Sequence, residues 1–248
     1  NVYCNGSNTG NIFISVAGGT PPFTYLWNNA STVKDRTSIV AGTYTLTVTD
    51  INGCTVSKTE VITEPSKIIM SKTLTNVTCN GGFDGSAVIA VSGGTPGYSF
   101  NWSDGSTLQN RTSLSAGTYI LTVHDANNCA DSLICLITEP QAIVITPTTV
   151  NLNCNNAANG SINLSVSGGS PSYSYLWNNG NTNANITGLI AGNYTVTVTD
   201  SKGCTATSAI TVTEPAAINL VLNQSPASCF GSSNGSISLN VSGGVPGY

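Results

Sequence analysis

This sequence has few charged residues. Asp, Glu, Lys and Arg make up 7% of the 248 residues, with seven basic and eleven acidic side chains. So few basic residues leave no basic patch for nucleic acid, and no apolar run approaches the ~18 residues of a membrane-spanning helix. Hydrophobic residues nevertheless make up 40% of the chain, which argues against disorder. We expect a folded chain with no nucleic-acid partner and no membrane span in these residues.

Catalytic side chains are equally scarce. His124 is the only histidine, so neither a Ser-His-Asp set nor a histidine cluster can be assembled. The Gly-Gly pairs lack the GxGxxG spacing of a phosphate-binding loop. The sequence therefore predicts no enzyme activity and no catalytic, cofactor-binding or metal-binding residues in this chain.

What the chain does contain is an internal repeat with a constant period. Four evenly spaced cysteines define it, because the steps between Cys4, Cys79, Cys154 and Cys229 are identical. The tryptophans, the Gly-Gly pairs and the Thr-Glu-Pro triplets keep the same register. The period predicts four repeats, at residues 1–65, 66–140, 141–215 and 216–248. The first and the last are incomplete, as expected of a window within a longer array.

Hydrophobic residues in each repeat alternate with polar ones, which is typical of strands with one buried face. Examples are Ile162, Leu164 and Val166 in one segment, and Tyr44, Leu46 and Val48 within residues 42–50, where threonines fill the other face. Gly-Gly-x-Pro ends the first type of segment and Asp-x-Asn-Gly-Cys forms a hairpin turn after the second. We expect an all-β fold, a tandem array of small immunoglobulin-like β-sandwich domains. Short linkers predict an elongated, semi-rigid rod with roughly 35–45 Å per repeat.

Each tryptophan is the last of three aromatic residues that stand two positions apart. This spacing places all three on one face of a strand. They could form a surface platform that stacks on sugars. We favour the alternative, a sandwich core with the indole beneath the sheet. The predicted core tryptophans are Trp27, Trp102 and Trp177.

One cysteine early and one late in each repeat indicate a disulfide framework in an oxidising compartment. A zinc site would need four ligands, and each repeat offers two cysteines and no repeated histidine. The constant separation of these two cysteines predicts bonds within repeats: Cys4 with Cys54, Cys79 with Cys129, and Cys154 with Cys204. Cys135 is left over, because no cysteine stands at its position in the other repeats.

This pairing conflicts with the expected topology. The last hairpin turn of a sandwich lies at the end where the chain enters, whereas a full first strand over residues 67–78 would carry Cys79 to the opposite end. Either that segment is bent or the strand count differs. Pairing between neighbours, Cys54 with Cys79 and Cys129 with Cys154, is the alternative.

Two acidic positions recur in all three copies, one occupied by Asp50, Asp125 and Asp200 and the other by Glu64, Glu139 and Glu214. Carboxylates gathered at a junction between repeats could bind calcium and stiffen the array. We favour a second interpretation, in which the aspartates make Asx turns and the glutamates accept backbone N–H groups. No other cofactor is expected.

Several motifs resemble a known family. The sequence C-N-G-x-x-x-G-S, then S-G-G-x-P and a tryptophan, then A-G-x-Y and T-E-P is similar to the SprB repeat of Bacteroidetes cell-surface proteins. In the second repeat it is carried by Cys79-Asn80-Gly81, Trp102 and Thr138-Glu139-Pro140. The tyrosine-threonine strand also resembles PKD-type immunoglobulin-like domains. Cys229-Phe230-Gly231 departs from the pattern locally.

The resemblance implies giant filamentous adhesins on the surface of a Bacteroidetes-like bacterium, exported by type IX secretion and linked to gliding motility. We expect a structural stalk segment of such an adhesin, whose partners are its neighbouring repeats and, through the whole protein, surface polysaccharide or the motility and secretion machinery. The rival hypothesis is a polysaccharide-binding module that uses the variable loops after each tryptophan and the aromatic stripe.

Overall fold

The computed structural model describes residues 1–245 and 247 of the chain. It divides into two compact units: Asn1–Val77 with Phe83–Thr138, and Thr78–Gly82 with Glu139–Tyr248. The described residues form nineteen strands and no helix. Consequently, no helix among them is long and apolar enough to cross a membrane. The two units are described separately.

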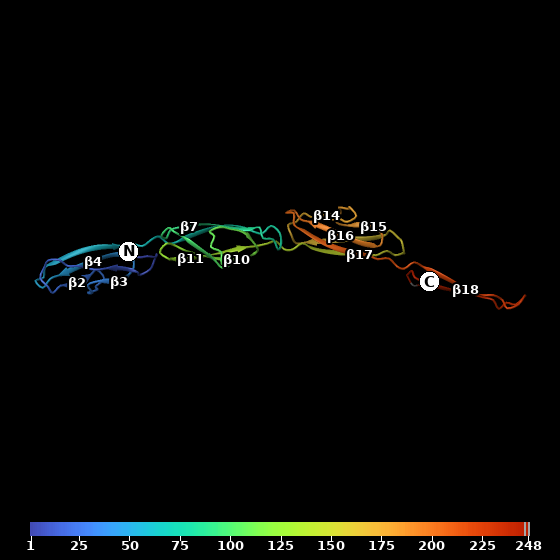
Figure 1. Ribbon diagram of the computed structural model, residues 1–248, viewed down its shortest axis with the longest axis horizontal. Helices are drawn as coiled ribbons and strands as arrows, with labels where there is room; N and C mark the ends of the chain where they lie inside the picture. Colours follow the sequence, from blue (N-terminus) through green and yellow to red (C-terminus); the bar gives the residue numbers. More distant parts are fainter. Residues whose placement is uncertain (246, 248) are drawn as a thin grey trace. The chain divides into compact units, whose positions relative to one another are not determined.

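Unit 1 contains one complete six-stranded sandwich. Its strands are β6 (Ile69–Thr75), β7 (Gly85–Ser92), β8 (Ser99–Trp102), β9 (Arg111–Leu114), β10 (Gly117–His124) and β11 (Ala130–Ile137). One antiparallel sheet has the order β6-β7-β9 and the other β8-β10-β11. In Figure 1, β7 lies across from β10 and β11. Because β7 to β8 and β9 to β10 each change sheets, the strand order is that of an immunoglobulin-like fold with three strands per sheet.

The other strands of unit 1 repeat this plan without a first strand. They are β1 (Gly10–Ile12), β2 (Thr24–Trp27), β3 (Arg36–Ile39), β4 (Gly42–Thr49) and β5 (Thr55–Ile62). β1 pairs with β3, and β4 lies between β2 and β5. The hairpin between β4 and β5 turns at residues 50–54, where the sequence predicts it.

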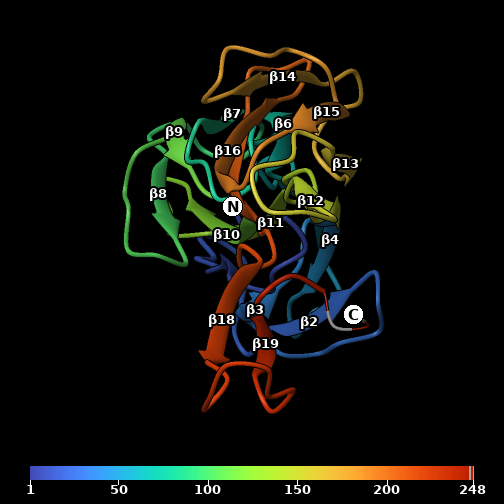
Figure 2. The same cartoon turned by 90° about the vertical axis from the view of Figure 1, so that its right-hand side faces the viewer.

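Unit 2 repeats the six-stranded plan one period later in the sequence. Its strands are β12 (Val144–Val150), β13 (Gly160–Ser167), β14 (Ser174–Trp177), β15 (Ile186–Leu189), β16 (Gly192–Thr199) and β17 (Thr205–Val212). The sheets are β12-β13-β15 and β14-β16-β17. β18 (Asn219–Ser225) and β19 (Ser236–Ser242) follow as a two-stranded antiparallel ribbon, visible side by side in Figure 2.

The alternating pattern sets which side chains enter each core. In the sandwich of unit 1, Ala87 and Ile89 of β7 face Leu121 and Val123 of β10, and all four are buried. Their neighbours along the strands, such as the exposed Val88, point outward, as the period of two requires. The all-β, immunoglobulin-like prediction is confirmed. The boundaries at residues 65, 140 and 215 and the rod shape stay predictions.

Candidate functional site at the stapled junction

The segment that follows the first strand of each repeat is tied to the end of the last strand. In unit 2, Leu152 N–H donates to the Thr213 carbonyl at 3.0 Å, and Asn156 N–H donates to Glu214 Oε2 at 2.7 Å. The equivalent bonds in unit 1 join Val2 with Thr63 and Gly6 with Glu64. The glutamate of Thr-Glu-Pro therefore accepts a hydrogen bond from the second residue after the first cysteine. This is the backbone role favoured above.

The repeated aspartate holds two loops together. Asp125 Oδ1 accepts the N–H groups of Asn127 and Cys129, both at 2.9 Å, which makes the hairpin turn. Its Oδ2 accepts the Thr95 N–H at 2.8 Å, from the loop that follows Gly-Gly. Asp50 and Asp200 make the equivalent bonds. One carboxylate thus fixes both the turn and the loop at the end where the chain enters the sandwich.

These donors decide the charge state of the carboxylate. Burial acts to raise the pKa of the Asp125 carboxyl, whose residue is 5% exposed. The three backbone N–H donors from Thr95, Cys129 and Asn127 together outweigh burial, so its pKa lies below the ordinary value of 3.8. The pKa of Asp200 is lowered chiefly by the hydrogen bond from Ser170 N–H. Both groups are carboxylates at neutral pH.

Among the described residues, no group of three or more His, Cys, Asp or Glu side chains is close enough to hold a metal ion. The acids that suggested calcium, exemplified by Asp125 and Glu64, accept backbone hydrogen bonds instead. Calcium binding at the junctions stays a prediction.

The linker between the first two repeats rests on the Gly-Gly loop. Gly94 N–H donates to the Ser66 carbonyl at 2.8 Å. A Cβ atom at Gly93 would lie 2.0 Å from the Lys67 carbonyl oxygen, and its φ of +73° is a conformation that glycine adopts freely. The close approach therefore requires glycine at this position, and it fixes where the next repeat begins.

The disulfides join consecutive repeats. Cys4 is bonded to Cys129, with Cα atoms 5.6 Å apart, inside unit 1. Cys79 is bonded to Cys204, with Cα atoms 5.5 Å apart, inside unit 2. Each bond spans 125 residues and connects the first cysteine of one repeat to the hairpin cysteine of the next. The predicted pairs Cys4–Cys54, Cys79–Cys129 and Cys154–Cys204 are wrong, and so is the alternative of Cys54–Cys79 and Cys129–Cys154.

The physical reason lies in β6, which is a full strand and carries the chain from one end of the sandwich to the other. Its start, Ile69, pairs with Ser92 near the hairpin turn, and its end, Thr75, pairs with Ser86. Seven residues at about 3.4 Å each separate these ends by roughly 20 Å. Disulfide Cα atoms must lie within about 7 Å of each other. Cys79 therefore cannot reach Cys129 in its own repeat.

Contacts around the Cys4–Cys129 bond reinforce it. Asn127 Nδ2 donates to the Tyr3 carbonyl at 3.1 Å, and Asn5 Nδ2 donates to the Pro65 carbonyl at 3.1 Å. Lys67 and Asp131 form an exposed ion pair at 3.8 Å. The junction inside unit 1 is thus held by the peptide linker, one disulfide and a small set of hydrogen bonds.

The remaining cysteines are not bonded to one another. Cys54, Cys154 and Cys229 are exposed thiols in this chain, which corrects the assignment of Cys54 and Cys154 to bonds within it. Cys135 is fully buried in the core of the unit 1 sandwich, and burial raises the pKa of its thiol. His124, the last residue of β10, is half-buried.

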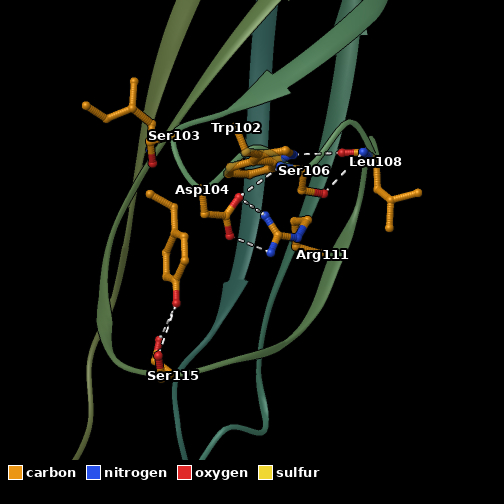
Figure 3. A network of polar contacts seen from close by, with 9 residues as sticks. Trp102, Ser103, Asp104, Ser106, Leu108, Arg111 and Ser115 are labelled. Atoms are coloured by element: carbon orange, nitrogen blue, oxygen red, sulfur yellow. Dashed lines mark hydrogen bonds and ion pairs between the residues drawn. The ribbon is translucent and has the colours of Figure 1, made fainter.

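Each of the three tryptophans is 2% exposed and lies in a core. Trp102 Nε1 donates to the Leu108 carbonyl at 2.7 Å, and the Arg111 guanidinium lies 5.5 Å from the ring centroid. Arg111 also pairs with both carboxylate oxygens of Asp104, as Figure 3 shows. The Arg36 guanidinium lies over the Trp27 ring in the same way. In unit 2 the residue equivalent to these arginines is Ile186. This contact is not among the features predicted from the sequence, although both arginines follow their tryptophan by nine residues.

The sequence profile described as SprB repeat matches residues 1–32, 71–107, 146–182 and 221–248. These segments make up more than half of the chain and contain the first cysteine, the Gly-Gly pair and, in the first three, the tryptophan. The chain belongs to the SprB repeat family. No curated protein is significantly similar to it in sequence. The chain is therefore a repeat protein built from SprB repeats.

Several solved structures of multidomain proteins are similar to this SprB-repeat chain. The structure of the N-terminal eight Ig domains of Down Syndrome Cell Adhesion Molecule is 12% identical, with 87% of this chain and 37% of that chain covered, at a TM-score of 0.35. The surface layer protein SbsC, domains 1–6, is 10% identical, with 89% and 43% covered, at a TM-score of 0.28. The SprB-repeat chain thus spans less than half the length of either. At these scores the matches carry no argument about function.

Proposed function

We propose that this SprB-repeat chain is a load-bearing stalk segment of a long filamentous adhesin on a bacterial cell surface, serving attachment or gliding motility. The Cys4–Cys129 bond carries the proposal, because it crosses the junction beside the peptide linker. Tension between the first two repeats then has two covalent routes. Disulfides of this kind persist in oxidising surroundings, which fits an extracellular location after type IX secretion.

Repetition suits this role, because length is set by copy number while each repeat contacts its neighbours. The partners we propose are the adjoining repeats and, through the whole adhesin, surface polysaccharide or the motility and secretion machinery. No enzyme activity is proposed. A calcium contribution to stiffness is a secondary proposal, tested by calorimetry of calcium titrated into the chain. A melting temperature that a chelator leaves unchanged would argue against it.

The direct test is single-molecule pulling of the full chain with and without a thiol reductant. With both bonds intact, the shortest covalent path from Cys4 to Cys204 runs through only the segment between Cys79 and Cys129. Reduction opens the whole peptide from Cys4 to Cys204, so the extended length should grow by roughly 500 Å at about 3.5 Å per residue. An extended length that is the same with and without reductant would contradict a load-bearing role for the bonds.

The binding alternative now depends on the variable loops, because the indole faces are buried. Its test is retention on a glycan array. Binding lost when residues 105–110 are replaced by residues 180–185, a change that keeps Asp104 and its pair with Arg111, with the melting temperature unchanged, would favour a binding module over a stalk.

A further inference from the structure

The positions of the cysteines divide the chain into two kinds of segment. Body segments run from Cys4 to Cys54, from Cys79 to Cys129 and from Cys154 to Cys204. Connecting segments, half as long, run from Cys54 to Cys79, from Cys129 to Cys154 and from Cys204 to Cys229. Each connecting segment holds the last strand of one repeat and the first strand of the next, such as β11 and β12.

The observed pairing joins these segments in alternation. From Cys4 the disulfide leads to Cys129, and a connecting segment then leads to Cys154. From Cys54 a connecting segment leads to Cys79, the second disulfide leads to Cys204, and another connecting segment leads to Cys229. These two routes share no residue. The body segment from Cys79 to Cys129 links one route to the other.

We propose that the chain is a covalent ladder. Its two rails are alternating disulfides and connecting segments, and its rungs are the body segments with most of each folded core. In this arrangement a pull between Cys4 and Cys204 passes through both disulfides and one rung, the segment from Cys79 to Cys129, and bypasses the rest of the peptide between them. This property follows from the pairing alone and does not depend on adhesion or gliding.

The ladder makes the chain tolerant of a cut. Breaking any one peptide bond between Cys4 and Cys204 leaves the two pieces joined by at least one disulfide, and a cut between Cys79 and Cys129 leaves them joined by both. Disulfides confined to single repeats would not do this, because a cut in a connecting segment would part the chain. A surface stalk exposed to proteases would therefore keep its continuity after a single cleavage.

The test places a recognition sequence for a site-specific protease at one position in each of three full-length variants. The first insertion follows Pro65, in a connecting segment. The second follows Ser106, in the exposed loop of a body segment. The third follows Pro215, beyond Cys204, and serves as the control. Free thiols are alkylated before denaturation so that the bonds cannot rearrange, and each cleaved protein is analysed by denaturing gel and mass with and without reductant.

Without reductant, the first two variants should keep the mass of the whole chain plus one water after cleavage, and each should give two fragments on reduction. The control should give two fragments even without reductant. Fragments from the Pro65 variant alone would indicate bonds within repeats, and fragments from the Ser106 variant alone would indicate the Cys54–Cys79 type of pairing. Either result would overturn the ladder.

Mass mapping of the unmodified chain covers the case in which an insertion disturbs folding. Peptides containing Cys4 should be recovered bonded to peptides containing Cys129, and Cys79 bonded to Cys204. Recovery of Cys4 bonded to Cys54 instead would overturn the proposal, whereas failure to bind any surface would leave the ladder intact and count against the adhesin.

Discussion

Single residues at the junction explain much of the repeated motif. Asp125 accepts three backbone N–H groups and Glu139 accepts one, from Gly81 at 2.6 Å. Charge-assisted bonds of this kind are stronger than neutral ones, and an unmatched N–H left by a substitution would be costly. These acids recur because each copy of the backbone needs the same acceptors.

Replacing Asp125 by Asn should weaken the entering end of the unit 1 sandwich by about 1–2 kcal/mol. The amide oxygen can still accept from Asn127 and Cys129, whereas the amide nitrogen cannot accept from Thr95. Hydrogen exchange at the Thr95 amide should therefore quicken more than at the Asn127 amide. Asp131→Asn is the matched control, since that residue makes an exposed ion pair. Equal exchange in both variants would contradict the acceptor role.

The Asp125 carboxylate should also make the stability of the folded chain depend on pH in the acidic range. Because its pKa is lowered on folding, Asp125 contributes stability that is fully present above its ordinary pKa of 3.8. That contribution is lost as pH falls below about 4 and through the folded pKa. The melting temperature of the wild-type chain should fall more steeply between pH 5 and 2 than that of Asp125→Asn. Parallel curves would mean that Asp125 is not linked to folding.

The contact of Arg111 with the Trp102 ring predicts that different substitutions at Arg111 reduce the stability of the sandwich by different amounts. Arg111→Ala should cost about 1–2 kcal/mol, since it exposes the indole face and removes the bidentate pair with Asp104. Arg111→Lys should recover little, because a lysine cannot make that planar pair. Arg111→Ile should recover more than half, as Ile186 fills this place in unit 2. Urea unfolding followed by exchange in β8 and β9 measures the order, and a lysine variant as stable as wild type would refute it.

At the scale of strands, the sequence predicted what depends on local pattern. Alternation in residues 42–50 predicted β4 and its buried face, and Asp-x-Asn-Gly-Cys predicted the following turn, because side-chain period and turn chemistry are short-range. Disulfide pairing is not short-range. The observed separation of 125 residues is the predicted one lengthened by a single period, so spacing cannot tell a bond within a repeat from one between repeats. The length of β6 decides between the two kinds of bond, because a full strand carries Cys79 away from Cys129. The same reasoning produced the conflict between the predicted pairing and the expected topology.

The Gly-Gly loop shows how an element fixes the junction. Gly93→Ala should severely destabilise the second repeat, since its Cβ would meet the Lys67 carbonyl at 2.0 Å and its φ is +73°. Gly105→Ala is the control, because Gly105 has a φ of +85° with nothing within 4 Å of an added Cβ. It should cost only the ~1–2 kcal/mol of a left-handed alanine. Melting temperatures compare them, and equal losses would show that backbone conformation alone accounts for both.

At the scale of the whole molecule, the two disulfides overlap. The loop closed by Cys4 and Cys129 contains Cys79, and the loop closed by Cys79 and Cys204 contains Cys129. The residues from Cys79 to Cys129 lie in both loops, so both bonds reduce the conformational entropy of the second repeat in the unfolded chain. Stability of one repeat is therefore not separable from the bonds of its neighbours, unlike in an array with only nearest-neighbour contacts.

Removing one bond tests this coupling. Cys129→Ser should destabilise unit 1 by up to about 5 kcal/mol, the chain-entropy value for a loop of this length. Cys54→Ser is the matched control, because Cys54 occupies the same turn position and is a free thiol. It should change stability by less than about 0.5 kcal/mol. Thermal unfolding should separate the variants without reductant, and with reductant all three should unfold alike, because both bonds are then broken in each. A loss at Cys54 as large as at Cys129 would instead place Cys54 in a bond and refute the staggered pairing on which the stalk and the ladder depend.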